Sequence, residues 1–193
     1  MTKKSPLPLT VFIDRDGVLN RDPKKKYYVR RPEEFRWVPG VFVALKSLAA
    51  AKARLIVISN QAGVGRGLVT TEALDAITQK MFRDLSARGV LLSGVLYCTH
   101  TPEEGCGCRK PKPGLFEAAD QMLGEAAARS RRYMIGDTER DMAAGRSAGC
   151  RTVLVLSGKT RTAADIKKFK TQPDHTAKDL KKAVQWILKP KNS

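Results

Sequence analysis

Acidic residues and long apolar runs are scarce in this chain. Lys and Arg total 36 against 19 Asp and Glu, which gives a formal net charge of +17. No apolar run approaches the roughly 20 residues that a membrane-spanning helix needs, and residues 1–6 contain no apolar signal-peptide core. These absences predict a cytoplasmic protein that does not span or bind a membrane.

Cysteine is also rare, with four residues among 193. Cytoplasmic thiols stay reduced, so a disulfide framework is not expected. Internal repeats and low-complexity linkers are absent as well. With 42% hydrophobic residues and ordinary glycine and proline contents, the chain is long enough to bury a core. We expect one domain over residues 1–193, and a monomer.

The shortage of acids leaves an excess of cations that favours anionic partners. Phosphorylated metabolites, nucleic acid and a membrane surface all fit this description. The lysines form short clusters rather than one block, among them residues 24–26 and 167–170. A general basic surface unrelated to any reaction is the simpler alternative.

A short apolar strand at residues 11–13 runs directly into Asp14, Asp16 and Gly17. Open α/β sheets place their ligand crevices at the carboxyl ends of buried parallel strands. Two carboxylates at such a strand end repel each other unless a cation lies between them. One could act as a nucleophile and the other as a proton shuttle. A polar turn without function is the alternative.

Two other predicted strands end in polar groups. The strand at residues 55–58 leads into Ser59, Asn60 and Gln61, followed by the glycine-rich segment 63–67, whose backbone N–H groups suit a phosphate. The strand at 132–135 leads into Asp137, with Asp141 one helical turn later. Asp137 would complete the cation site, and Asp141 would either orient that site or be only an acid in the first turn of a helix.

Further strands are expected at residues 94–97 and 152–156. Helices are expected after residue 40, over 71–88, 115–128 and about 178–189, and before Gly149. The polar segment 21–39 is too long for a minimal connection. Its aromatic residues favour an ordered loop over the strand ends.

Three cysteines and a histidine lie within eleven residues, at Cys98, His100, Cys106 and Cys108. They match a tetrahedral Cys₃His zinc site, and four such ligands leave no open coordination position. We therefore predict a structural zinc loop over residues 98–108. Cys150 is most simply a buried small hydrophobe.

Arg109 and Lys110 follow the zinc loop directly and precede a proline-rich turn. Two cations held by a metal-bound loop are good candidates for binding phosphate, Lys110 as a point charge and Arg109 as a fork. A solvated basic turn is the alternative.

The strand-end motifs, taken in order, resemble those of the haloacid dehalogenase superfamily of phosphohydrolases. Asp14 to Gly17 resembles its first motif, Ser59 the second, Lys110 the third and Gly136 to Asp141 the fourth. The resemblance implies an α/β fold with a doubly wound, Rossmann-like parallel sheet and helices on both faces. The cysteine–histidine loop resembles the zinc-containing branch that has no cap domain.

That resemblance implies a Mg²⁺-dependent phosphatase that forms an aspartyl phosphate. Asp14 would be the nucleophile and Asp16 the general acid and base, with Ser59 and Lys110 stabilising the phosphoryl group. Mg²⁺ would be held by Asp14, the backbone carbonyl of Asp16, and Asp137. The residues expected to bind substrate are Asn20, Asp22, Asn60, Gln61 and Arg109.

The branch acts on small phosphorylated substrates. Asn20, the segment 65–67 and the segment 113–114 resemble the heptose bisphosphate phosphatases, so a sugar phosphate is the favoured substrate. Histidinol phosphate is the alternative because its phosphatases share the catalytic motifs. A nucleic-acid 3′-phosphatase is less favoured, since the chain lacks an aromatic-rich platform for a single strand. Thr138 stands where the branch often has a lysine.

Overall fold

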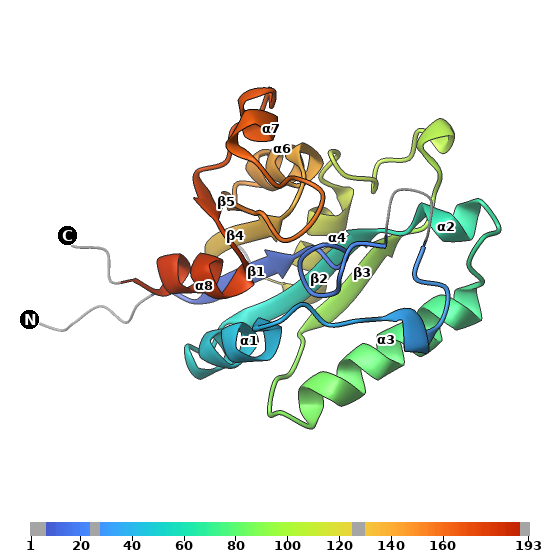
Figure 1. The fold of residues 1–193 in the computed structure, drawn as a ribbon, viewed down its shortest axis with the longest axis horizontal. Coiled ribbons are helices and arrows are strands. Elements are labelled where there is room, and N and C mark those ends of the chain that lie inside the picture. The colour runs from blue at the N-terminus through green and yellow to red at the C-terminus, as the bar shows by residue number, and fades with distance from the viewer. Residues whose placement is uncertain (1–6, 24–27, 125–129, 190–193) are drawn as a thin grey trace, which may run out of the picture.

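The computed structural model describes residues 7–23, 28–124 and 130–189. Six parallel strands within these ranges form one sheet with the spatial order β3-β2-β1-β4-β5-β6 (Figure 1). The strands are β1 (Leu9–Ile13), β2 (Arg54–Asn60), β3 (Gly94–Cys98), β4 (Arg131–Gly136), β5 (Arg151–Val155) and β6 (His175–Ala177).

Helices cover both faces of this sheet. Alternate side chains of a strand point to opposite faces, so Val11 and Ile13 join one apolar cluster and Phe12 joins the other. The first cluster includes residues of α1 (Val41–Ala50), α3 (Thr71–Ser86) and α8 (Leu180–Leu188), and the second residues of α4 (Gly114–Leu123) and α6 (Glu139–Ser147). The predicted doubly wound α/β fold is confirmed, and no cap domain is inserted among the described residues.

The strand order places the carboxyl ends of β1, β2 and β4 side by side. β1 pairs with β2 on one side and with β4 on the other. The chain runs outward from β1 to β3 and then returns to build β4, β5 and β6 on the opposite side. In sheets of this order, ligands bind where the direction reverses. Here that point lies between β1 and β4, directly below Asp14 and Asp137.

The aromatic residues of the segment 21–39 are ordered in its described part, as expected. A 3₁₀ turn, η1 (Pro32–Glu34), precedes Phe35 and Trp37. Trp37 packs against Phe35 and Phe42, with ring centroids 4.9 and 4.8 Å apart. Its indole N–H donates to Asp84 of α3 at 2.7 Å. These contacts attach the segment to α1 and α3. The basic residues at 24–26 lie outside the described part, as does the predicted end of the helix at 115–128.

Two short helices and one strand were not predicted. They are α2 (Ala62–Gly65), α7 (Ala163–Lys167) and β6. β6 has three residues and includes polar side chains, so neither its length nor its pattern gives a strand signal. None of the helices in the described ranges is both long and apolar enough to cross a lipid bilayer.

Asp174 fixes the start of β6 against β5. Its Oδ2 accepts hydrogen bonds from the backbone N–H of Thr152 at 2.7 Å and from the Thr152 hydroxyl at 2.8 Å. The backbone N–H of Asp174 donates back to that hydroxyl at 3.1 Å. Although partial burial opposes the charge, these donors and Arg146 lower the pKa of the Asp174 carboxyl.

We expect Asp174→Ala to lower the free energy of unfolding by about 2 kcal/mol, because the buried Thr152 N–H loses its acceptor. The folded-state pKa lies below the unfolded value, so the contribution is complete above about pH 4 and is lost as the pH falls through the folded pKa. Urea denaturation at pH 7 and pH 3 measures both effects. Asp75→Ala, on the exposed face of α3, is the control, and an equal loss in both variants would contradict the assignment.

Candidate active site

A buried ion cluster stands at the carboxyl ends of β1 and β4. The Lys110 ammonium lies 2.8 Å from Asp14 Oδ1 and 2.6 Å from Asp141 Oδ1, and it donates to the backbone carbonyl of Ile58 at 3.0 Å. Lys110 is only 3% exposed. Asn60 holds its backbone, because the amide group accepts from the Lys110 N–H at 3.1 Å and donates to the Lys110 carbonyl at 3.0 Å.

This cluster sets the protonation of its members. Burial alone would lower the pKa of Lys110, but the carboxylates of Asp14 and Asp141 raise it above the ordinary value. Burial alone would raise the pKa of Asp141, but Lys110 and Thr138 lower it. For Asp14, burial outweighs Lys110, so its pKa is raised. The lysine is therefore a fixed positive charge next to the carboxylate that faces the site.

Asp137 adds a third buried carboxylate. Oxygens of Asp14, Asp137 and Asp141 all lie within 4.8 Å of one another. Burial and the two neighbouring carboxylates raise the pKa of Asp137 well above its usual range. One ammonium does not balance three carboxylates, and carboxylate oxygens are preferred ligands of Mg²⁺. The donor set thus fits a divalent cation between Asp14 and Asp137.

Asp16 is held on the other side of Asp14 by several donors. Its carboxylate accepts from Asn20 at 2.8 Å, from Gln61 at 2.8 Å and from the Arg15 guanidinium at 3.1–3.3 Å. Burial would raise the pKa of Asp16, yet Arg15, Gln61 and Asn20 together lower it. Gly17 permits the turn that follows because its φ of 90° is one that other residues rarely adopt.

A pocket of about 290 Å³ opens above these groups. Most residues predicted from the sequence line it, namely Asp14, Asp16, Ser59, Asn60, Arg109, Lys110 and Asp137. Asn20 and Gln61 do not line it, since both are buried and use their amides on Asp16. Asp22 lies in a neighbouring hollow with Arg21 and Tyr28. A substrate-binding role for these three residues remains a prediction.

Several residues of the pocket wall were not predicted. They include Tyr28, Arg66, Thr138, Arg140 and Lys159, whereas Asp141, which also lines the pocket, was a predicted candidate. Lys159 belongs to the segment 157–160 after β5, which packs against Asp137: the Lys159 N–H donates to Asp137 Oδ2 at 2.6 Å and the Thr160 N–H to its carbonyl at 3.3 Å. The signal that could have revealed this segment is a polar turn directly after a buried strand in the same sheet.

Within the glycine-rich segment 63–67, the N–H groups of residues 64–67 already have acceptors in the protein. Backbone N–H groups of residues 64–68 donate to protein carbonyls, including that of Thr99. Gly63 lies against the Tyr28 ring, and a side chain at Gly65 would overlap the Thr99 carbonyl. The predicted phosphate cradle is therefore replaced by close packing of α2 against the wall of the site.

The four predicted zinc ligands come together after β3. Cys98 Sγ lies 3.6 Å from Cys106 Sγ, Cys108 Sγ lies 3.4 Å from Cys106 Sγ, and His100 Nδ1 lies 3.3 Å from Cys108 Sγ. Ligands about 2.3 Å from one zinc ion stand roughly 3.8 Å apart in a tetrahedron. The sulfur and nitrogen atoms therefore fit a single zinc ion, and Arg109 and Lys110 follow this cluster directly.

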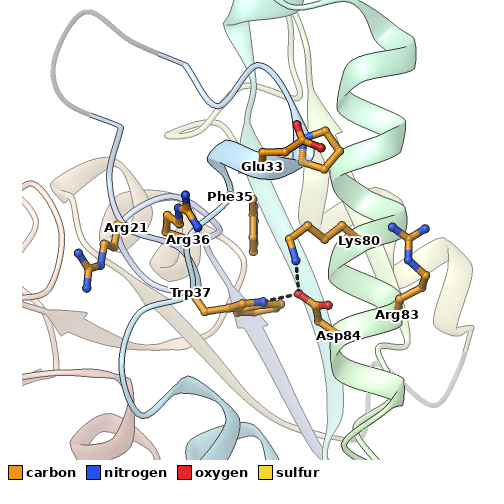
Figure 2. A pocket seen from close by; sticks show the side chains of 9 residues that line it. Arg21, Glu33, Phe35, Arg36, Trp37, Lys80, Arg83 and Asp84 are labelled. Atoms are coloured by element: carbon orange, nitrogen blue, oxygen red, sulfur yellow. Dashed lines mark hydrogen bonds and ion pairs between the residues drawn. The ribbon is translucent and has the colours of Figure 1, made fainter.

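A larger hollow, about 810 Å³, lies between the segment 32–37 and α3. Figure 2 shows that its cationic groups do not converge: Lys80 turns to Asp84 at 2.6 Å, whereas Arg21 and Arg36 lie on the far side of Phe35. The residues that line this larger hollow include none of Asp14, Asp137 and Asp141. The smaller pocket above Asp14 is thus the candidate active site.

The fold and the strand-end groups define a hydrolase of the haloacid dehalogenase (HAD) class that acts on phosphate monoesters. A family model described as HAD-hydrolase-like matches residues 107–183. This range holds the zinc loop's last cysteine, Lys110, Asp137 and Asp141, but not β1.

Curated relatives align with most of the chain. The chain is 40% identical over 166 residues to the D-glycero-β-D-manno-heptose-1,7-bisphosphate 7-phosphatase of Haemophilus ducreyi, covering 82% of this chain and 88% of that protein. It is 35% identical over 179 residues to the enzyme of the same name from Helicobacter pylori J99, covering 92% and 95%. The chain belongs to the D-glycero-β-D-manno-heptose-1,7-bisphosphate 7-phosphatase family.

Solved structures of heptose bisphosphate phosphatases have the same fold as this chain. A D,D-heptose 1,7-bisphosphate phosphatase from B. bronchiseptica, described as complexed with magnesium and phosphate, superposes with a TM-score of 0.82 at 30% identity, covering 93% of this chain and 98% of that one. The corresponding phosphatase from Burkholderia thailandensis gives a TM-score of 0.69 at 26% identity, covering 94% and 99%.

We expect Gly158→Ala to weaken binding of a divalent cation by about 10–100-fold, the range found for groups that orient metal ligands. A Cβ at Gly158 would overlap the Asp137 carboxylate, so Asp137 must move. Isothermal titration with Mg²⁺ measures the affinity. Gly89→Ala, at a left-handed position with open space around it, controls for backbone strain and should keep the affinity, whereas an unchanged affinity in Gly158→Ala would refute this role.

Proposed function

We propose that this protein is a Mg²⁺-dependent phosphatase that hydrolyses the 7-phosphate of D-glycero-β-D-manno-heptose 1,7-bisphosphate. The observation that carries the proposal is the Lys110–Asp14 pair, with Nζ 2.8 Å from Oδ1, at the bottom of a pocket lined by cations. Membership of the heptose bisphosphate phosphatase family supports the substrate. Catalysis of phosphoryl transfer consists mainly of positioning and charge stabilisation, which this pocket supplies.

Asp14 is the proposed nucleophile. Its carboxylate attacks the phosphorus in line, the bond from phosphorus to the sugar oxygen breaks, and an aspartyl phosphate forms. Lys110 fixes the carboxylate before attack and stabilises charge on the phosphoryl oxygens during it. Ser59, at the end of β2, lines the same pocket and donates a further hydrogen bond to these oxygens.

Asp16 is the proposed general acid and base. It gives a proton to the departing sugar oxygen, and in the second step it takes a proton from the water that attacks the aspartyl phosphate. Phosphate is released and both carboxylates return to their starting state. Because Asp16 and Asp14 line one pocket, the two roles are served by side chains two residues apart.

The metal ligands proposed for Mg²⁺ are Asp14, the backbone carbonyl of Asp16, and Asp137. When bound, Mg²⁺ supplies positive charge that neutralises the phosphate and the carboxylates. Asp141 lies in the same buried cluster, but its carboxylate is engaged by Lys110 and by the hydroxyl and N–H of Thr138 at 2.6 and 3.0 Å. We assign it to holding Lys110.

The pocket rim suits a substrate with two phosphates. Besides Lys110, it carries Arg66, Arg109, Arg140 and Lys159, whereas one phosphoryl group needs fewer cations. We propose that Arg109 and Asn60 bind substrate directly, that Asn20 and Gln61 act through Asp16, and that Asp22 lies at the edge of the site. Histidinol phosphate carries one phosphate and an amine, so this rim favours it less, and nucleic acid remains the least favoured alternative.

A structural zinc ion is proposed at Cys98, His100, Cys106 and Cys108. The convergence of three sulfur atoms and an imidazole nitrogen within 4.8 Å of one another supports it, since this is a preferred ligand set of zinc. The cluster connects β3 to the segment that carries Arg109 and Lys110. Zinc would therefore fix the position of the phosphate-binding lysine without entering the reaction.

In the presence of Mg²⁺ the purified protein should release phosphate from the heptose bisphosphate with a higher kcat/KM than from histidinol phosphate. Asp14→Asn should lower this turnover by about 1,000-fold or more, as loss of a nucleophile does, without loss of fold. Malachite-green assays and circular dichroism measure the two quantities. Asp75→Asn is the control, and substantial turnover by Asp14→Asn would disprove the role of Asp14.

The purified protein should contain one zinc ion per chain, the occupancy of a closed four-ligand site. Cys106→Ser should lose the metal and lower the melting temperature, because the loop loses its cross-link. Atomic absorption and thermal unfolding measure both. Cys150→Ser, a buried cysteine outside the cluster, should keep the zinc. Loss of zinc from this variant as well would contradict the ligand assignment.

A further inference from the structure

Among the described residues Arg15 is the largest fully buried side chain, with 1% of it exposed, and the proposed mechanism gives it no task. It lies between the two catalytic carboxylates in sequence. Its guanidinium donates from Nη2 to Gln61 Oε1 at 2.8 Å and to Asp16 Oδ2 at 3.1 Å, and from Nε to Asp16 Oδ1 at 3.3 Å. On its other side it stands 5.6 Å from the centre of the Tyr97 ring.

These contacts immobilise Asp16. Each carboxylate oxygen receives one amide and one guanidinium donor: Oδ1 from Asn20 at 2.8 Å and Arg15, Oδ2 from Gln61 at 2.8 Å and Arg15. Rotation of the carboxylate would break both sets of bonds at once. The Asp16 side chain is 18% exposed, and it lines the pocket above Asp14. Its plane is therefore fixed relative to the bound substrate.

The same residues join the ends of two strands. Gln61 also donates to Ser59 Oγ at 3.0 Å, so it links the end of β2 to Asp16 after β1. The Arg15 carbonyl accepts from the N–H groups of Leu19 and Asn20 at 2.9 and 3.1 Å. This turn brings the Asn20 side chain back to the Asp16 carboxylate, to which it donates. Arg15 thus holds Asp16 with its guanidinium and shapes the turn with its backbone.

Stability alone does not account for a buried arginine here. Burying an ion pair costs desolvation that well-packed apolar residues of similar volume avoid. The Arg15 Nη1 atom is buried and has no hydrogen-bond partner within the described residues. The arrangement thus carries an energetic penalty, and what it provides in return is a carboxylate fixed in one plane at the mouth of the site.

We propose that Arg15 is a positioning residue which, together with Gln61, orients the Asp16 carboxylate for proton transfer to the leaving oxygen. This inference rests on the proposed function. The O–P bond of the ester breaks while an O–H bond forms between the sugar oxygen and the proton carried by Asp16, so a misdirected carboxylate slows only esters whose leaving oxygen needs that proton.

The planar fork of arginine is essential to this role. Its Nε and Nη2 atoms reach both Asp16 oxygens, and Nη2 also reaches Gln61. A lysine keeps the charge but has one nitrogen at the end of a flexible chain, so it cannot hold a carboxylate in a plane. Arg15→Lys therefore separates orientation from charge.

The test compares two esters in Arg15→Lys. The sugar oxygen of the heptose bisphosphate is strongly basic and needs a proton to depart, whereas the nitrophenolate of p-nitrophenyl phosphate departs without one. The kcat/KM value reports steps up to departure of the leaving group, so it isolates the transfer made by Asp16. We expect a loss of about 100-fold for the sugar ester and of less than about fivefold for the aryl ester.

A second readout follows from the base role of Asp16. Slower hydrolysis of the aspartyl phosphate should produce a pre-steady-state burst of nitrophenol in Arg15→Lys, close to one equivalent per enzyme, that the unmodified protein lacks. Gln61→Met, which removes both the acceptor for Arg15 and a donor to Asp16 at similar volume, should show the same selectivity. If circular dichroism shows that Arg15→Lys does not fold, Gln61→Met is used for the test in its place.

Arg132→Lys is the matched control. Arg132 is a largely buried arginine paired with Asp120 at 3.0 Å, and it lies near the start of β4, at the opposite end of the strand from the site. It should change both esters equally. Equal losses for the two esters in Arg15→Lys, no loss, or the same selectivity in Arg132→Lys would overturn the proposal. Failure of the unmodified protein to hydrolyse either ester would instead refute the proposed function.

Discussion

The ion cluster at Lys110 determines how the other parts of the site are arranged. The Lys110 ammonium joins Asp14 after β1 to Asp141 in α6, and the Lys110 backbone is hydrogen-bonded to Asn60 at the end of β2. Three segments far apart in sequence thus converge on one charge. Removal of a partner from such a buried pair leaves an uncompensated ion. The sheet, the segment that carries Lys110 and α6 therefore have to form together for the Asp14 carboxylate to be held.

Much of this arrangement could be predicted from the sequence. Five of the six strands have apolar runs, and polar residues stand at the carboxyl ends of three of them, at Asp14, Ser59 and Asp137. Because the carboxyl ends of parallel strands share one edge of a sheet, these residues were expected to meet. The spacing of Cys98, His100, Cys106 and Cys108 predicted the convergence that the structure shows. In each of these cases the pattern of neighbouring residues in the sequence was sufficient for the prediction.

The remaining features depend on contacts between distant segments. Gln61 follows a strand and was expected to reach the substrate, but Arg15 and Asp16 engage its amide. No local signal shows that Arg15, in a polar tetrapeptide, is buried. The segment 157–160 after β5 contacts Asp137 only because β5 pairs with β4. The contacts of these residues depend on which strands pair with each other. The hydropathy pattern of the sequence does not specify the order of the strands in the sheet.

The position of β1 has a consequence for the order of folding. β1 is a central strand of the sheet, and its partner β4 begins more than a hundred residues later in the chain, with Leu9 opposite Arg131. Long-range parallel pairing of this kind folds slowly, because a large loop must close first. Until β4 is synthesised, the edge of β1 that pairs with it has no partner strand, and unpaired strand edges of this kind make an incompletely folded chain prone to aggregation.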